Sequence, residues 1–144
     1  MLKPYLYLAS DHAGFELKKR LCEFLEQEGF GFDDLGAYEE KSCDYADYAH
    51  LLASKIDGQS FGILICGSGI GISIAANRHE GIRCALCSES LSARLARAHN
   101  NANVLALGAR LIGEAQALEI LRVFLQTPFE GGRHEYRIQK IEGS

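Results

Sequence analysis

The sequence predicts a three-layer α/β/α sandwich built on a five-stranded parallel sheet. Short apolar segments alternate with segments of helical periodicity along the whole chain. One of the apolar segments, 61–66, has no polar face, as expected of a parallel strand covered by helices on both sides. Strands alternating with helices in this way are joined by right-handed crossovers. The 144 residues fit one domain, 1–144.

The strand pattern occurs five times, at residues 5–10, 30–35, 61–66, 82–87 and 103–108. The first helix follows residue 12, with Leu17, Leu21 and Leu25 on its apolar stripe. Asp11 can cap the beginning of this helix, and Gly29 can end it. The other helices are expected from Tyr45 to near Gly58, over 71–77, over 89–98 and around 117–125, where Pro128 closes the last one.

The bulk composition excludes several kinds of partner. A net charge of −4 argues against a nucleic-acid partner, which needs a basic face. No apolar run approaches the roughly 18 residues of a membrane span, so no membrane partner is expected. The N-terminus has no cleavage-site pattern, which predicts a cytoplasmic protein. Its five cysteines are therefore expected to be reduced thiols.

A glycine-rich turn follows the apolar strand, at the strand edge where α/β sheets bind ligands. Its glycines are Gly67, Gly69 and Gly71, so the third is out of register for the dinucleotide fingerprint. Glu89 lies at about the distance of a ribose-binding acid, which keeps a nucleotide-binding module as an alternative. The glycines could also serve only a tight strand-to-helix turn.

Cys66 ends the strand just before backbone N–H groups that open a helix. Such a position favours negative charge on the sulfur, and the same N–H groups can stabilise an adjacent oxyanion. A base beside an anion hole is what abstraction of a proton alpha to a carbonyl requires. The alternative is a buried structural thiol.

No metal site and no cofactor are expected. Cys84 and Cys87 have C-x-x-C spacing, but residues three apart in a strand point to opposite faces. No second cysteine pair or histidine pair completes a zinc set.

Six motifs resemble the ribose-5-phosphate isomerase B family, in the expected order and over nearly the whole chain. They are ASDHAGFELK, DYADYA, GILICGSGIGISIAANR, GIRCALC, ARAHNNANVLALGAR and EGGRHEYR. The resemblance implies a metal-free aldose–ketose isomerase that interconverts ribose 5-phosphate and ribulose 5-phosphate through a cis-enediolate. It also implies a Rossmann-like sandwich that forms a homodimer or a dimer of dimers, with active sites shared between subunits. Related isomerases of allose 6-phosphate and galactose 6-phosphate have a similar pattern and stay as alternatives.

The resemblance assigns the proton transfer to the glycine turn. Cys66 matches the base that moves the proton between C1 and C2. Another branch of the family has a glutamate at the position of Ile72, which cannot titrate, so the chain fits the cysteine branch. Ser68 matches a hydroxyl residue beside the sugar oxygens. The anion hole for the enediolate matches Gly67, Ser68, Gly69, Ile70 and Gly71.

Other residues match contacts to the sugar. His99 matches the group that opens the furanose ring, with Asn100 alongside; a polar residue interacting with a helix C-terminus is the alternative. Asp11 and His12 match ligand contacts, with the helix cap as a second role for Asp11. Tyr45 matches a pocket tyrosine, although its helical spacing also fits core packing.

A basic set matches the phosphate clamp: Arg110, Arg133 and Arg137, with His134 nearby. Arg133 and Arg137 are four residues apart, so one helical face can present both to a dianion. A solvated charged tail is the alternative. Because these residues follow Pro128 and two glycines, the segment from about 129 to 144 is expected to reach a neighbouring subunit.

Overall fold

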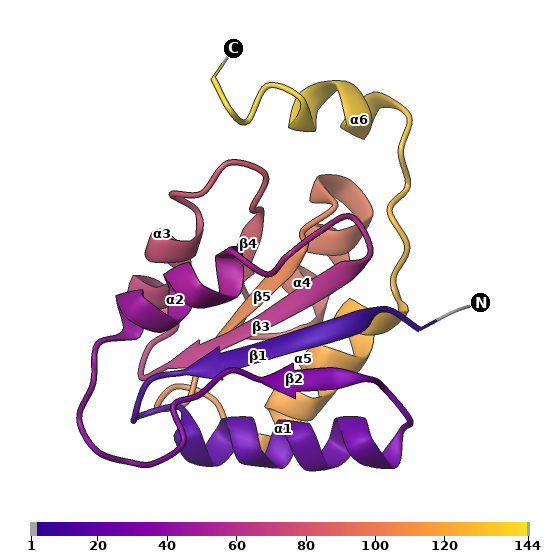
Figure 1. Ribbon diagram of the computed structural model, residues 1–144. Helices are drawn as coiled ribbons and strands as arrows, with labels where there is room; N and C mark the ends of the chain where they lie inside the picture. Colours follow the sequence, from indigo (N-terminus) through magenta and orange to yellow (C-terminus); the bar gives the residue numbers. More distant parts are fainter. Residues whose placement is uncertain (1–2, 144) are drawn as a thin grey trace.

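The computed structural model describes residues 3–143, a parallel sheet flanked by helices (Figure 1). Residues 1, 2 and 144 of the expected domain lie outside the described residues. The elements follow in the order β1 (Tyr5–Ser10), α1 (Phe15–Gln27), β2 (Phe32–Asp34), α2 (Tyr45–Ala53), β3 (Ser60–Cys66), α3 (Ile70–Ala76), β4 (Cys84–Leu86), α4 (Ser90–Asn100), β5 (Val104–Gly108), α5 (Glu114–Gln126) and α6 (Arg133–Ile138).

The five strands are parallel in the order β2-β1-β3-β5-β4. Helices α1, α4 and α5 pack on one face of the sheet, and α2 and α3 on the other. This arrangement confirms the predicted sandwich and its five strands. Strand β3 is central, which explains why it is apolar on both faces.

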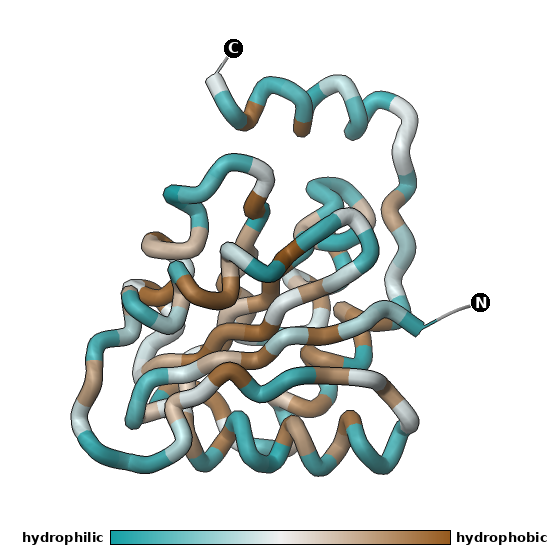
Figure 2. Tube along the Cα trace, viewed as in Figure 1, coloured by the Kyte–Doolittle hydropathy of each residue, from teal (hydrophilic) through white to brown (hydrophobic). Residues whose placement is uncertain are grey.

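Successive residues of β3 pack into two different hydrophobic cores, one on each face of the sheet. Ile63 and Ile65 pack with α1, α4 and α5, whereas Leu64 and Cys66 pack with α2 and α3. Figure 2 shows the central strands as the most hydrophobic part of the chain. Each large apolar side chain buried in this way contributes about 1.5–3 kcal/mol. Cys66 is therefore held by a rigid strand with close packing on both faces.

Some element boundaries differ from the expected ones. Strands β2 and β4 have three residues each, because each lies at an edge and pairs with one neighbour. Helix α4 continues to Asn100 and ends at Asn101, whose left-handed φ of 47° stops it. His99 and Asn100 thus lie on its last turn.

Asp11 does not cap α1, contrary to the expectation. Helix α1 begins at Phe15, its N-cap is Gly14, and no side chain caps it. The Asp11 carboxylate instead stabilises the turn before the helix, where its Oδ1 accepts N–H bonds from Ala13 (2.9 Å) and Gly14 (3.1 Å). Gly29 follows the end of α1 with a φ of +79°, as expected.

The carboxyl ends of β1 and β3 form the switch point of the sheet. The strands are neighbours, and the Asp11 N–H donates to the Ile65 carbonyl (3.2 Å). After β1 the chain turns to α1 on one face, and after β3 it turns to α3 on the other. The crevice left between two such loops is where open α/β sheets bind ligands. Within residues 3–143, no helix has the length and apolar character needed to cross a membrane.

Candidate active site

The glycine turn after β3 surrounds a buried thiol. Cys66 is 4% exposed, and the Gly69 N–H donates to its Sγ (3.2 Å). Gly69 has a φ of +78°, and a Cβ there would come within 2.5 Å of Leu86 Cδ1. Only glycine fits this position without displacing its neighbours. The close packing fixes the Gly69 N–H as a donor to the sulfur.

Ser68 completes the turn on its exposed side. Its Oγ accepts the Ile70 N–H (3.1 Å), which fixes the side chain at the beginning of α3. The hydroxyl hydrogen remains able to donate, because this bond uses only an oxygen lone pair. Ser68 therefore offers an oriented hydroxyl next to the thiol of Cys66.

Asp11 and His12 follow β1, directly beside this turn. Asp11 is 5% exposed, with one carboxylate oxygen fixed by the two N–H bonds described above. His12 Nδ1 accepts the Cys43 N–H (3.2 Å). A neutral His12 therefore carries its proton on Nε2, where it can donate to a ligand.

Tyr45 forms a wall of the crevice. A Cβ on Gly71 would lie 2.5 Å from Tyr45 Cζ and 2.8 Å from its Oη, so the ring lies against the first turn of α3. The side chain is 43% exposed, which favours the expected pocket role over core packing. The ring fills the space that the missing side chain of Gly71 leaves open, which counts against the nucleotide-binding alternative.

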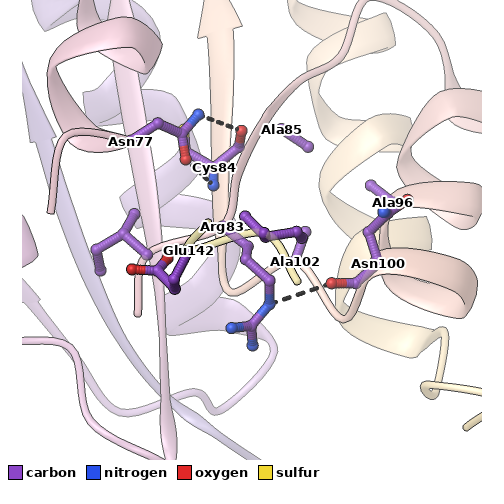
Figure 3. Close-up of a pocket in the computed structure, with 10 residues that line it drawn as sticks. Asn77, Arg83, Cys84, Ala85, Ala96, Asn100, Ala102 and Glu142 are labelled. Carbon is purple, nitrogen blue, oxygen red and sulfur yellow. Dashed lines mark hydrogen bonds between the residues drawn. The ribbon is translucent and has the colours of Figure 1, made fainter. Parts of the chain in front are cut away.

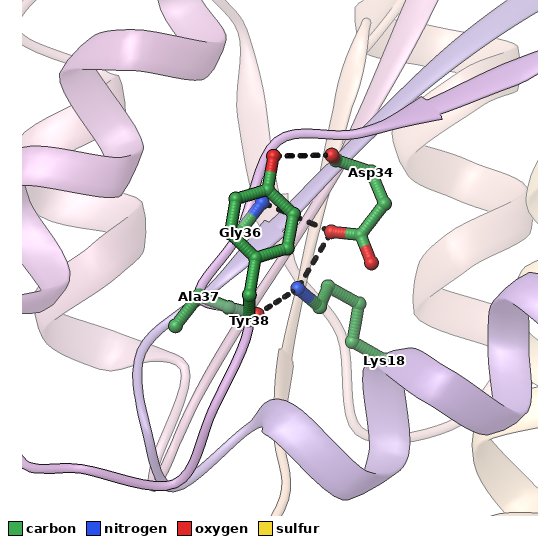
Figure 4. A network of polar contacts seen from close by, with 5 residues as sticks. All are labelled: Lys18, Asp34, Gly36, Ala37 and Tyr38. Atoms are coloured by element: carbon green, nitrogen blue, oxygen red, sulfur yellow. Dashed lines mark hydrogen bonds and ion pairs between the residues drawn. The ribbon is translucent and has the colours of Figure 1, made fainter.

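Lys18 is a buried residue that the sequence analysis missed. It has no exposed surface, and its Nζ donates to Asp34 Oδ1 (2.6 Å) and to the Ala37 carbonyl (2.5 Å) (Figure 4). The same Asp34 oxygen accepts the Gly36 N–H (2.9 Å), and Tyr38 Oη donates to the Asp34 carbonyl (2.9 Å). The network fixes the beginning of the loop that joins β2 to α2.

The β2–α2 loop positions two residues that contribute to the crevice. Its Cys43 supplies the N–H bonded to His12, and Tyr45 follows at the beginning of α2. Lys18 therefore acts on the site through the loop. A signal was present in the sequence, because Lys18 is three residues before Leu21 and seven before Leu25 on the buried stripe of α1.

Arg110 follows β5 at the same edge. Its N–H donates to the Gly67 carbonyl (2.9 Å), and its Nη1 would lie 3.0 Å from a Cβ on Gly67. The guanidinium therefore covers the glycine turn. The residues gathered at the carboxyl edge are called here the cysteine half: Asp11, His12, Tyr45, Cys66, Gly67, Ser68, Gly69, Ile70, Gly71 and Arg110.

The remaining expected residues gather elsewhere, where α6 meets α4. The rings of His99 and His134 stack with centroids 4.3 Å apart and an interplanar angle of 13°. Burial lowers the pKa of His134, and the nearby charges of His99 and Arg133 lower it further. These residues are called here the histidine half: His99, Asn100, Arg133, His134 and Arg137.

The two halves lie at opposite ends of the parallel strands, the cysteine half at the carboxyl ends and the histidine half at the amino ends. Helix α4 leads from Asn100 into Val104, and Val104 pairs with Gly62 near the beginning of β3. Cys66 is at the other end of β3, paired with Gly108. One chain therefore does not bring His99 to Cys66. The expected clamp is divided as well, with Arg110 in the cysteine half and Arg133 and Arg137, both exposed, on α6.

A cavity of about 480 Å³ adjoins the histidine half (Figure 3). Asn100 lines it together with Arg83, whose Nε donates to the Asn100 carbonyl (3.1 Å). Ile141 and Glu142 of the C-terminal segment also line it. Cys66 does not line this cavity, which leaves space beside Asn100.

Two other sets of side chains bear on metal binding. Burial raises the pKa of Cys84 to about 12 and that of Cys87 to about 11, which keeps both thiols protonated at neutral pH. Protonated thiols are poor metal ligands. Within residues 3–143, one group of three metal-capable side chains comes together: His99, Glu130 and His134. Glu130 begins the motif EGGRHEYR, but no role was predicted for it, because its contact with His99 joins segments that are distant in the sequence.

Relatives of known identity share this architecture. The chain is 44% identical to ribose-5-phosphate isomerase B of Escherichia coli over 133 residues, covering 91% of this chain and 89% of that protein. The Thermotoga maritima ribose 5-phosphate isomerase structure matches with a TM-score of 0.95 at 52% identity, covering 98% and 99% of the two chains. A Mycoplasma genitalium ribose-5-phosphate isomerase B structure with bound ribulose-5-phosphate matches with a TM-score of 0.92 at 43% identity, covering 95% and 93%.

The family model described as Ribose/Galactose Isomerase matches residues 6–141, which include every residue of both halves. These similarities support the same family as the fold and the buried thiol in its glycine turn. The chain belongs to the ribose/galactose isomerase family.

Proposed function

We propose that the protein interconverts D-ribose 5-phosphate and D-ribulose 5-phosphate by proton transfer through a cis-enediolate. The observation that carries this proposal is the Gly69 N–H bonded to Cys66 Sγ at the switch point of the sheet, beside Asp11. This contact places the proposed base next to backbone N–H donors, in a turn whose close packing fixes its shape. Similarity to an isomerase structure with bound ribulose-5-phosphate supports the same substrate.

The first chemical step is ring opening, which exposes the C1 aldehyde of the sugar. His99 takes the hydroxyl proton at C1 and delivers it to the ring oxygen as the bond between C1 and that oxygen breaks, so the furanose opens without net change in protons. General acid–base assistance of this kind is worth about 10²–10⁴ in rate.

The isomerisation then moves one proton between two carbons. The Cys66 thiolate removes the C2 proton, and the electron pair forms the C1–C2 double bond while charge develops on O1. The backbone N–H groups from Gly67 to Gly71 stabilise that charge. Ser68 moves a proton between O2 and O1, and the Cys66 thiol returns its proton to C1. No step needs a metal or a cofactor.

The substrate phosphate is assigned to Arg133 and Arg137. Both guanidiniums are exposed, four residues apart on α6, and have no ion-pair partner among residues 3–143. Two guanidiniums on one helical face can bind a dianion with several oriented hydrogen bonds. Arg110 at the glycine turn completes the clamp once the halves meet.

We place the complete site between two subunits of a homodimer or a dimer of dimers, because one chain separates its halves. The segment from about 129 to 144, which contains α6, would then contribute the histidine half to the neighbour's cysteine half. The neighbour would meet the exposed face of α3, where Ile70 is 50% and Ile74 58% exposed next to the glycine turn. Five reduced cysteines are consistent with a cytoplasmic enzyme.

A galactose or allose phosphate is the second candidate substrate, since the family model also covers galactose isomerases. Turnover of ribose 5-phosphate, allose 6-phosphate and galactose 6-phosphate, each with excess EDTA, tests the proposal. The expected result is the highest kcat/KM on ribose 5-phosphate, unchanged by the chelator. A preference for a hexose phosphate, or activity restored only by a divalent ion, would overturn it.

A further inference from the structure

Three side chains, His99, Glu130 and His134, converge beside α6. His134 Nε2 lies 3.5 Å from Glu130 Oε1, and His99 Nε2 lies 3.8 Å from the same oxygen. All three ligand atoms lie within 4.8 Å of one another. Glu130 has no role in the proposed mechanism. Its backbone is fixed to α4, because its N–H donates to the Ala98 carbonyl (2.9 Å).

The distances are too long for hydrogen bonds from either ring to the carboxylate. His134 Nε2 is also buried without a hydrogen-bond partner among residues 3–143, on a side chain that is only 8% exposed. Buried polar atoms are nearly always paired, so an orphaned imidazole nitrogen indicates a missing partner. Here it lies beside a second imidazole and a carboxylate.

Two imidazoles and a carboxylate are ligands that Zn²⁺ accepts, at about 2.0–2.2 Å each, with ligand atoms about 3.3 Å apart in a tetrahedron. The separations of 3.5 and 3.8 Å are close to that value. The two rings are nearly parallel, so one must tilt to share an ion. His99 is 39% exposed and Glu130 54% exposed, so both have room to move.

We propose that His99, Glu130 and His134 form a binding site for Zn²⁺ or a similar divalent transition metal, and that the bound metal inhibits the enzyme. A metal on His99 Nε2 would occupy the lone pair with which this histidine opens the sugar ring. Binding and turnover would then exclude each other. The inhibition rests on the proposed function, whereas the binding of the metal does not.

Isothermal titration of the metal-free protein with ZnCl₂ tests the site, with Glu130→Gln as the decisive variant. Even a hydrogen-bond partner of a metal ligand is worth about tenfold or more in affinity, so loss of a direct ligand should weaken binding by at least about tenfold. Glu130 is exposed, so the variant is expected to fold. His79→Gln is the matched control, because it removes the other close histidine pair (His50 Nδ1 to His79 Nε2, 2.7 Å) and should leave the high-affinity site intact.

Isomerase assays complete the test. Glu130→Gln should retain the metal-free activity on ribose 5-phosphate and resist concentrations of ZnCl₂ that inhibit the wild type. Equal Zn²⁺ affinity of wild type and Glu130→Gln would overturn the site, and tight binding without inhibition would overturn its effect on His99. A protein that binds Zn²⁺ through Glu130 but never converts ribose 5-phosphate would refute the proposed function alone.

Discussion

His99 and Cys66 lie at opposite ends of the strands of the same parallel sheet, His99 at the amino ends and Cys66 at the carboxyl ends. Cys66 is the last residue of β3, whereas His99 lies on the last turn of α4, which returns to the amino edge before β5 begins. Two groups proposed to act on adjacent sugar atoms are therefore separated within each chain. The fold can use both on one substrate only if a second copy supplies the missing half.

Mixing two inactive variants tests this arrangement. Cys66→Ala damages the cysteine half and Arg137→Ala the histidine half, so a heterodimer has one intact site and one doubly damaged site. Random reassociation gives about half heterodimers, so activity should recover to about a quarter of the wild-type value. Mass spectrometry of intact dimers verifies that subunits have exchanged.

A same-half pair is the control. Cys66→Ala mixed with Asp11→Ala leaves no intact site in any dimer and should recover nothing. Recovery in this control, or verified exchange without recovery in the first mixture, would contradict the shared site.

Much of the fold was predictable from periodicity. The order of strands and helices follows from alternating apolar patterns, which depend on local sequence and on burial by covering helices. The ends of β2 and β4 could not be predicted, because the length of an edge strand depends on its pairing with one neighbouring strand. The end of α4 depended on the left-handed conformation of Asn101.

The site was predictable in part. Asp11 and Cys66 were expected together because parallel strands end at a common edge. The separation of Arg110 from Arg133 was not foreseen, since a motif gives a residue's identity but not its edge of the sheet. Glu130 and Lys18 were missed because their roles depend on contacts between distant segments, with Asp34 for Lys18 and with His99 for Glu130.

Cys66 should be the thiol whose alkylation destroys activity. Burial raises the pKa of Cys22 and Cys84 to about 12 and that of Cys87 to about 11, so these thiols have little thiolate at pH 8. Iodoacetamide should therefore inactivate the enzyme in step with modification of Cys66, and ribose 5-phosphate should protect it. Peptide mapping of the partly inactivated enzyme measures this.

Replacing the thiol gives the matching genetic test. Cys66→Ala removes the base but fills the same small space, so turnover should disappear with little change in thermal stability. Near-normal turnover in this variant would refute the assignment of Cys66 as the base.

His99→Asn separates ring opening from proton transfer. Turnover of ribose 5-phosphate, which is mostly cyclic, should fall by about 10² or more, in line with the loss of a general acid–base group. Ribulose 5-phosphate cannot close to the same furanose, so exchange of its C1 proton with deuterated solvent should fall much less. Equal losses in both assays would give His99 a different role.

Gly71→Ala should disturb substrate binding through Tyr45. The new Cβ would lie 2.5 Å from the tyrosine ring, which is half exposed and can move away. Losing the ordered ring should raise KM by roughly 2- to 10-fold, the equivalent of one aromatic contact. In a Tyr45→Ala background the same glycine substitution should have almost no further effect on KM. Additive effects would show that the ring and the turn act independently.

Stability should fall at alkaline pH in part because of the partly buried thiol of Cys84. Its pKa is about 12 in the folded protein and close to 9 when unfolded, so the unfolded chain loses its proton first as the pH rises. A raised folded-state pKa gives full stability below pH 9, and that stability is lost as the pH rises from 9 to 12, by an amount on the order of a few kcal/mol. Urea unfolding between pH 8 and 11 should show this loss, and Cys84→Ala should reduce its slope. Cys43→Ser, which replaces a thiol in the β2–α2 loop, should keep the wild-type slope. If Cys84→Ala and the wild type lose stability equally over this range, Cys84 is not the cause.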